Sequence, residues 1–167
     1  MNLDYQQYIP ADFPDDAKVW VYQSGRILSI PEALHLEKMI QEFSSEWNTH
    51  GALNKGFVQL LFGQFLVLMA DESAHRISGC SIDSSVRFIK EVEKTFSVNL
   101  FDRQSLAFIV KDKVQIIPMS QVKYAADNGF INGDTLFFNN LVASKKELLE
   151  NWIVPVKSSW LGARYGF

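Results

Sequence analysis

The sequence predicts a single α+β domain whose first half follows the order of a ferredoxin-like βαββαβ unit. The length, 167 residues, is the usual size of one domain. With 47% hydrophobic and 21% charged residues, the composition is typical of a globular protein. Up to residue 110, segments with strand and helix character come in the order strand, helix, strand, strand, helix, strand. No repeat, low-complexity tract or linker interrupts residues 1–167, so we expect one domain.

The first elements have clear boundaries. Residues 1–17 are rich in Asp, Pro and Tyr and form an irregular lead-in, and residues 18–24 have the β-favouring composition of a strand. Ser29-Ile-Pro-Glu32 has the pattern of a capping box with proline in the first helical turn. The apolar residues after it recur at helical spacing on one face: Leu36, Met39, Ile40, Phe43 and Trp47. We expect that helix to end at residues 48–51.

Two very apolar runs, residues 57–62 and 65–71, are separated by Gly63-Gln64 and predict a hairpin with a type II′ turn. Their near-continuous apolarity predicts that both are central strands, buried on both faces. Helix remains the alternative for runs of this kind, because periodicity alone does not separate the two.

The clearest amphipathic helix follows a polar loop at residues 72–79. Its predicted start is capped by Ser81 or Asp83. Its predicted apolar face is formed by the following residues: Ile82, Val86, Ile89, Val92 and Phe96.

The C-terminal part is expected to extend the sheet by a strand or two and to cover it with two helices. Residues 104–110 and 114–118 read as strands around a turn at 111–113, and residues 135–138 as a further short strand. Helices are predicted at 120–128, ended by Gly129, and from a capping box at Ser144 to about Trp152. Residues 153–167 are an aromatic tail that the pattern does not assign.

Composition excludes several classes of function. The net charge is −3 and no basic stripe is present, so neither nucleic acid nor a membrane surface is an expected partner. One cysteine cannot form an internal disulfide, which fits a reducing compartment. The N-terminal residues lack the pattern of a signal peptide, and the most apolar window is too short to cross a bilayer. We therefore expect a cytoplasmic protein.

The lone cysteine, Cys80, lies at the predicted start of the amphipathic helix, where the helix dipole favours a thiolate. A nucleophilic role would need a base, and His50 or His75 could supply it, oriented by Asp71 or Asp83. The structural alternative is that Cys80 is a small buried apolar residue that packs a tight turn.

Small polar residues crowd the same segment and suggest a ligand-binding loop. Hydroxyls and backbone N–H groups at a helix start suit a phosphate or carboxylate. The candidate ligand-binding residues are Ser78, Gly79, Ser81, Asp83, Ser84 and Ser85. Plain helix capping is the alternative, because Asp83 would repel an anion held close to it.

Metal and cofactor motifs are not evident. Glu32-x-x-His35 and Glu72-x-x-His75 match the spacing of di-iron ligands, but that chemistry needs two such pairs on facing helices and further carboxylates. Neither zinc-ligand spacing nor a nucleotide-binding or hydrolase motif is present. We expect no metal and no cofactor.

Several segments together resemble a family of short uncharacterised bacterial proteins whose members often carry the automatic label "ABC transporter ATPase". The strings that carry the resemblance are VWVYQS, W-x-x-HG, QFLVLMADES, SGCSIDSSVRFIKEVE, LFDR, LFFNNLVASKKEL and VPVKSSW. The resemblance implies no established activity or site residues. An ABC ATPase needs a Walker A loop, a Walker B carboxylate and a signature motif, and only Asp71-Glu72 mimics one of these, so ATP hydrolysis is not expected.

The leading functional hypothesis is a non-catalytic domain that binds a partner protein or a small molecule. The aromatic C-terminal part is a candidate homodimer surface. The alternative hypothesis is a thiol-dependent enzyme that uses Cys80 with His50.

Overall fold

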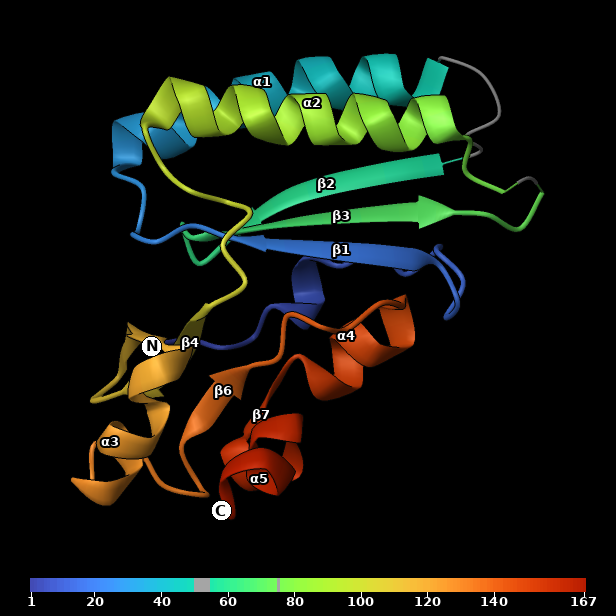
Figure 1. Ribbon diagram of the computed structural model, residues 1–167. Coiled ribbons are helices and arrows are strands. Elements are labelled where there is room, and N and C mark those ends of the chain that lie inside the picture. The colour runs from blue at the N-terminus through green and yellow to red at the C-terminus, as the bar shows by residue number, and fades with distance from the viewer. Residues whose placement is uncertain (50–54, 75) are drawn as a thin grey trace.

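The computed structural model describes residues 1–49, 55–74 and 76–167. Two long helices, α1 and α2, lie over one face of a sheet, and a second sheet with shorter helices lies on the other side of that sheet (Figure 1). The elements are β1 (Lys18–Gln23), α1 (Ile30–Thr49), β2 (Lys55–Leu61), β3 (Phe65–Asp71), α2 (Gly79–Phe96), β4 (Ser105–Val110), β5 (Lys113–Pro118), α3 (Val122–Asp127), β6 (Leu136–Phe138), α4 (Lys145–Asn151), β7 (Ile153–Pro155) and α5 (Trp160–Tyr165). None of the described helices is long and apolar enough to cross a membrane.

The α+β class is confirmed, and the ferredoxin-like core is not. In the first sheet the strand order is β1-β3-β2, with β3 antiparallel to both neighbours. This is the split βαβ arrangement, because β1 and β2 run parallel on either side of β3. The strand that would complete the unit, β4, belongs instead to a second antiparallel sheet of order β5-β4-β6-β7.

Hydrogen bonds along the outer edge of β1 help to explain why β4 does not pair there. The Val19 N–H donates to the Ala143 carbonyl at 3.1 Å, and the Lys145 N–H donates to the Ala17 carbonyl at 2.9 Å. Further along the edge, Arg103 Nη1 donates to the Val21 carbonyl at 3.1 Å. Residues 143–145 and one side chain therefore already occupy part of the edge that a fourth strand would need.

The hairpin between β2 and β3 confirms strands and excludes the helix alternative, but its turn differs from the prediction. Phe62 and Gly63 both have positive φ, 55° and 63°, and the Gln64 N–H donates to the Leu61 carbonyl at 3.1 Å. That is the pattern of a type I′ turn, whose twist suits a hairpin, one residue earlier than the predicted type II′ turn.

Of the two predicted central strands, only β3 is central. It is buried from Phe65 to Ala70, whereas β2 is an edge strand in which only Val58 and Leu61 are fully buried. The prediction that β2 is central was wrong. Its apolar side chains pack against neighbouring elements, although no strand of the described residues pairs with its outer edge.

Both long helices are confirmed, and the first begins as its pattern predicts. The Ser29 N–H donates to Glu32 Oε2 at 2.8 Å, and the Glu32 N–H donates to Ser29 Oγ at 3.3 Å, which is a complete capping box.

The start and the buried face of α2 need correction. Its N-cap is Ser78, whose hydroxyl accepts from the Ser81 N–H at 3.1 Å, and neither Ser81 nor Asp83 caps it. Ile82 is 37% exposed, while Ser81 and Ser85 are buried. In the first turn of α2 the side that meets α1 is that of Ser81, whose carbonyl accepts from Trp47 Nε1 at 3.1 Å.

The C-terminal part contains more than was expected. A two-residue turn, Lys111-Asp112, joins β4 to β5. The strand β6 and the helix α4 lie where a strand and a helix were predicted. The unassigned tail supplies β7 and α5, and its aromatic residues pack against the core that α3 and the second sheet share. Even the lead-in is anchored, because Tyr5, Ile9 and Phe13 are buried.

Trp152 fills the space between the two sheets. Its ring meets Phe65 of β3 edge-on at 5.4 Å and Phe138 of β6 at 5.5 Å, measured between ring centroids. Its Nε1 donates to Asn140 Oδ1 at 3.0 Å. Tyr5 packs on the same ring at 4.9 Å and donates its hydroxyl to the Leu148 carbonyl at 2.6 Å, and burial raises the pKa of Tyr5 to about 12.

Trp152→Ala should lower the free energy of unfolding by about 3–5 kcal/mol, because it removes a fully buried indole from the contact between the sheets. Urea denaturation followed by circular dichroism measures the change. Leu141→Ala is the matched control: that side chain is 66% exposed, and its removal should change stability by no more than about 0.5 kcal/mol. Equal losses in the two variants would contradict the packing role of Trp152.

Candidate functional site

A groove between α1 and the start of α2 contains the predicted site. It has a volume of about 520 Å³. Its lining residues are Glu46, Trp47, Ser78, Cys80, Ser81, Ser84 and Arg87. Cys80 is exposed in the first turn of α2. The thiol therefore faces an open groove and is not the small buried residue of the structural alternative.

The structure brings together only some of the predicted residues. Ser78, Ser81 and Ser84 line the groove with Cys80, whereas Gly79, Asp83 and Ser85 are not among its lining residues. His50, the predicted base, and His75, its alternative, lie outside the described residues. The pairing of Cys80 with His50 therefore stays a prediction.

Most hydroxyls at this helix start already have local hydrogen bonds. Ser78 Oγ accepts from the Ser81 N–H and donates to Ser81 Oγ at 3.0 Å. Ser85 Oγ donates to the Ile82 carbonyl at 2.6 Å. From the other helix, Trp47 Nε1 donates to the Ser81 carbonyl at 3.1 Å. These bonds are those of capping and helix contact, which explains much of the concentration of serine without a ligand.

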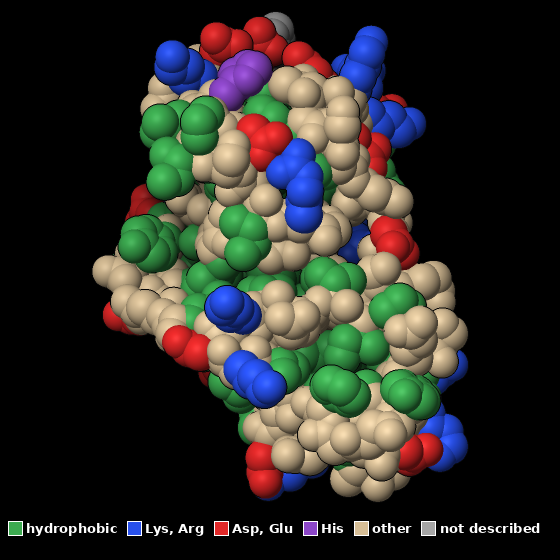
Figure 2. All heavy atoms as spheres, turned by 90° about the vertical axis from the view of Figure 1, so that its left-hand side faces the viewer, with side chains coloured by type: hydrophobic (Ala, Val, Ile, Leu, Met, Phe, Trp, Pro, Cys, Tyr) green, Lys and Arg blue, Asp and Glu red, His purple; other side chains and the backbone are tan. Residues whose placement is uncertain are grey.

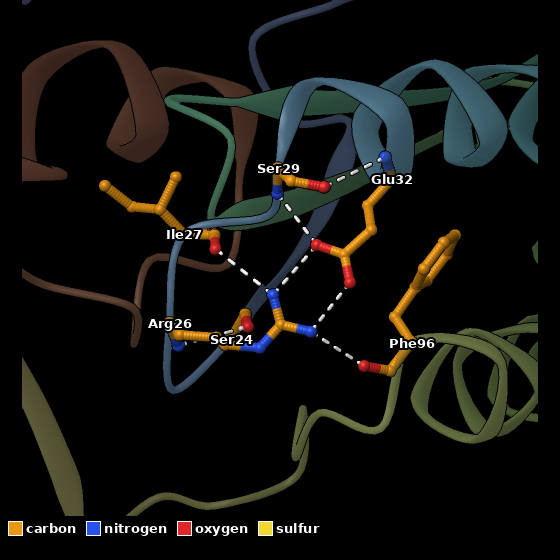
Figure 3. Close-up of polar contacts among 6 residues, drawn as sticks. All are labelled: Ser24, Arg26, Ile27, Ser29, Glu32 and Phe96. Carbon is orange, nitrogen blue, oxygen red and sulfur yellow. Dashed lines mark hydrogen bonds and ion pairs between the residues drawn. The ribbon is translucent and has the colours of Figure 1, made fainter.

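Glu32, from the first pair with di-iron spacing, belongs to a structural clamp (Figure 3). The Arg26 guanidinium donates to both carboxylate oxygens of Glu32, at 2.9 and 2.8 Å, and to the Phe96 carbonyl at the end of α2, at 2.9 Å. The hydrogen bonds from Arg26, then those at the helix cap, lower the pKa of Glu32 to about 2. The His35 ring lies edge-on to Phe96. This clamp ties the start of α1 to the end of α2.

Asp71 and Glu72, which mimic the end of a Walker B strand, close the loop after β3. Asp71 Oδ1 accepts from the Ser73 hydroxyl at 2.6 Å and from its N–H at 2.8 Å, and these hydrogen bonds lower the pKa of Asp71. Glu72 Oε1 accepts from the Ile77 N–H at 2.8 Å. Within the described part of the chain, no group of three or more His, Cys, Asp and Glu is placed to hold a metal.

A second groove, between β5 and α3, was not predicted from the sequence. It has a volume of about 610 Å³. Its lining residues are Val110, Lys111, Lys113, Gln115, Ile117, Gln121, Tyr124, Ala125 and Phe130. Tyr124 and Phe130 are 67% and 63% exposed, although both are large aromatic side chains. On the side of the molecule where Figure 1 shows α3 and β4, hydrophobic side chains gather in the lower half, with Lys or Arg beside them (Figure 2).

Charge around the second groove is positive. Lys111 and Lys113 line it, and the described residues offer neither of them an ion-pair partner. The carboxylate between them, Asp112, is bound by the N-terminal ammonium of Met1. The sequence held one signal for this groove, the alternation of polar and apolar residues over 113–116. The exposure of Tyr124 and Phe130, in contrast, depends on how α3 packs.

Glu32→Gln should remove part of the stability that the protein has above pH 4.5. The folded-state pKa of Glu32 lies below the ordinary value of 4.5, so the ion pair stabilises the fold above that pH, and the contribution is lost as the pH falls from 4.5 towards 2. The difference between the urea midpoints of the wild type and the variant should therefore be largest at pH 6 and shrink steadily as the pH falls from 4.5 towards 2. Glu37→Gln, at an exposed position of α1, is the control. A difference as large at pH 2.5 as at pH 6 would contradict the clamp.

Comparison with known proteins gives no match: no protein-family model fits the chain, and no similarity to a curated protein or to a solved structure is significant.

Proposed function

We propose that this protein is a non-catalytic domain that binds a segment of another protein in the groove between β5 and α3. The observation that carries the proposal is the pair of exposed aromatic side chains, Tyr124 and Phe130, at an apolar groove of about 610 Å³. The volume lies in the range of ligand-binding clefts, and exposed aromatic residues beside a hollow are typical of interfaces.

The other aromatic residues near the C-terminus have internal roles, which singles out these two. Trp160, Tyr165 and Phe167 are partly buried and pack against the core under the second sheet. A homodimer through the C-terminal part is therefore best sought at the Tyr124–Phe130 surface. Light scattering at several protein concentrations tests for the homodimer. A mass that rises with concentration indicates a second copy of the chain, and a constant monomer mass leaves a different protein as the partner.

Several observations favour binding over catalysis, and we also propose a cytoplasmic location. Ser78 and Ser81 of the α1–α2 groove bond to each other at the helix cap, and Asp71 and Glu72 bond to the loop after β3. These four side chains already have local hydrogen-bond partners, which argues against their holding a phosphate for ATP hydrolysis. A single cysteine, which cannot form an internal disulfide, fits a reducing compartment.

A thiol-dependent enzyme is the second candidate, favoured by the exposure of Cys80 in a groove beside Arg87. Iodoacetamide should label Cys80 in the folded protein because the thiol is accessible. Under the binding proposal, the rate at pH 7 should match that of a cysteine in an unstructured peptide, with Cys80→Ser as the unlabelled control. A rate at least about tenfold higher, lost in His50→Gln, would favour the enzyme instead.

Binding at the β5–α3 groove can be tested by photo-crosslinking in cells of the natural host. A photoreactive residue at Gln121 lies in the groove, and one at Lys90 lies on the exposed face of α2. We expect adducts from position 121 that disappear when Tyr124→Ser and Phe130→Ser are added, with little change in thermal stability, because both side chains are exposed. Adducts that survive the double substitution, or that form equally from position 90, would contradict the proposal.

A further inference from the structure

The outer edge of β5 is open, and the turn before it shows which backbone groups it offers. Lys111 and Asp112 both have positive φ, 50° and 64°, and join β4 to β5 as a two-residue turn with Val110 opposite Lys113. The residues that flank such a turn form a hydrogen-bonded pair, so the backbone of Lys113 points to β4.

Backbone groups alternate along the strand, so those of Val114 and Ile116 point outward. The Met119 N–H provides an independent check. It donates to the Gln104 carbonyl at 2.7 Å, so Met119, which is an even number of residues from Lys113, also points inward. β5 is the outermost strand of its sheet, and these outward groups have no hydrogen-bond partner in the described part of the chain. The edge therefore offers two donors and two acceptors in the spacing of a strand.

The edges of the first sheet are partly covered in the described part of the chain. Residues 143–145 and Arg103 cover the edge of β1. On β2, Asn48 binds both the N–H and the carbonyl of Gly56, and Gln59 Nε2 donates to the Leu60 carbonyl. The edge of β5 differs from both in degree, because neither Val114 nor Ile116 has a partner for its outward groups among the described residues.

The groove lies on the face of β5 that an added strand would share. Lys113, Gln115 and Ile117 alternate on this face, and all three line the groove with Tyr124 and Phe130. A strand beside β5 would direct every second side chain into that apolar space. Lys113 and Pro118 are residues of the kind that protect an edge strand from pairing with other chains. Exposed aromatic side chains such as Tyr124 and Phe130 would not give such protection.

We propose that the partner segment binds as an added strand on β5, with its main chain bonded to Val114 and Ile116 and alternate apolar side chains in the groove. Acidic residues of the segment lie near Lys111 and Lys113, whose charges have no counterpart in the described residues. The missing N–H of Pro118 ends the pairing at that point. This inference rests on the proposed function and adds the partner's conformation and charge.

Hydrogen exchange in the full chain tests the strand directly. The probe is a linear heptapeptide selected by phage display on the wild-type protein and counter-selected on the variant with Tyr124→Ser and Phe130→Ser. In the free protein the Val114 and Ile116 amides should exchange fast, while the inward amides of Gln115 and Ile117 exchange slowly. The bound peptide should slow Val114 and Ile116 about tenfold or more, and the selected sequences should be acidic and apolar in alternation.

Two substitutions at one position separate the backbone bond from packing. Val114→Pro removes the outward N–H, whereas Val114→Ala removes a similar amount of packing and keeps it. We expect a loss of peptide affinity of about tenfold or more for the proline variant only. If that variant fails to fold, the exchange measurement on the wild type still decides. Lys111→Glu with Lys113→Glu should weaken binding, and Lys90→Glu on α2 should not.

The outcomes distinguish this inference from the proposed function. Peptides that shift the Tyr124 and Phe130 signals but leave Val114 and Ile116 in fast exchange would overturn strand addition and keep the groove. Selection of basic peptides would overturn the charge assignment. Failure to enrich any groove-dependent peptide would overturn both proposals. Protection of Val114 and Ile116 that rises with protein concentration, without peptide, would assign the edge to a second copy of the chain and overturn the peptide partner.

Discussion

The packing of Trp152 between the two sheets is the interaction on which the rest of the structure depends. The indole is fully buried among Tyr5, Phe65 and Phe138, which come from the lead-in, the first sheet and the second sheet. Its one polar atom is satisfied by Asn140, whose amide nitrogen donates in turn to Gln23 Oε1 at 2.9 Å. Apolar burial supplies most of the free energy of such a contact, and the hydrogen bonds fix how the parts are oriented.

The position of the second sheet is linked to the segment that lies along the edge of β1. Residues 143–145 precede and begin α4, and Trp152 directly follows that helix. The segment that lies along β1 and the ring that fills the core therefore belong to one unit. With that edge used, β4 pairs with β5 and β6 instead. The same arrangement leaves β5 at the outside of its sheet. The proposed binding edge is thus a consequence of how the fold is closed.

The two grooves differ in what their polar groups do. At the start of α2, the hydroxyls of Ser78, Ser81 and Ser85 are bonded within the helix or across to α1. At β5, the backbone groups of Val114 and Ile116 have no such partners among the described residues. Because unsatisfied strand edges pair readily with other chains, the second groove is the better candidate for recognition.

The sequence by itself determined the local elements, because capping boxes, helical periodicity and apolar runs act over a few residues. The Ser29–Glu32 box, the buried face of α1 and the hairpin strands were predictable in this way. Only the tertiary structure decided that β2 is an edge strand, that β4 leaves the first sheet and that Tyr124 and Phe130 stay exposed. These depend on contacts between residues far apart in the chain, such as Arg103 with Val21 and Lys145 with Ala17, which no local pattern encodes.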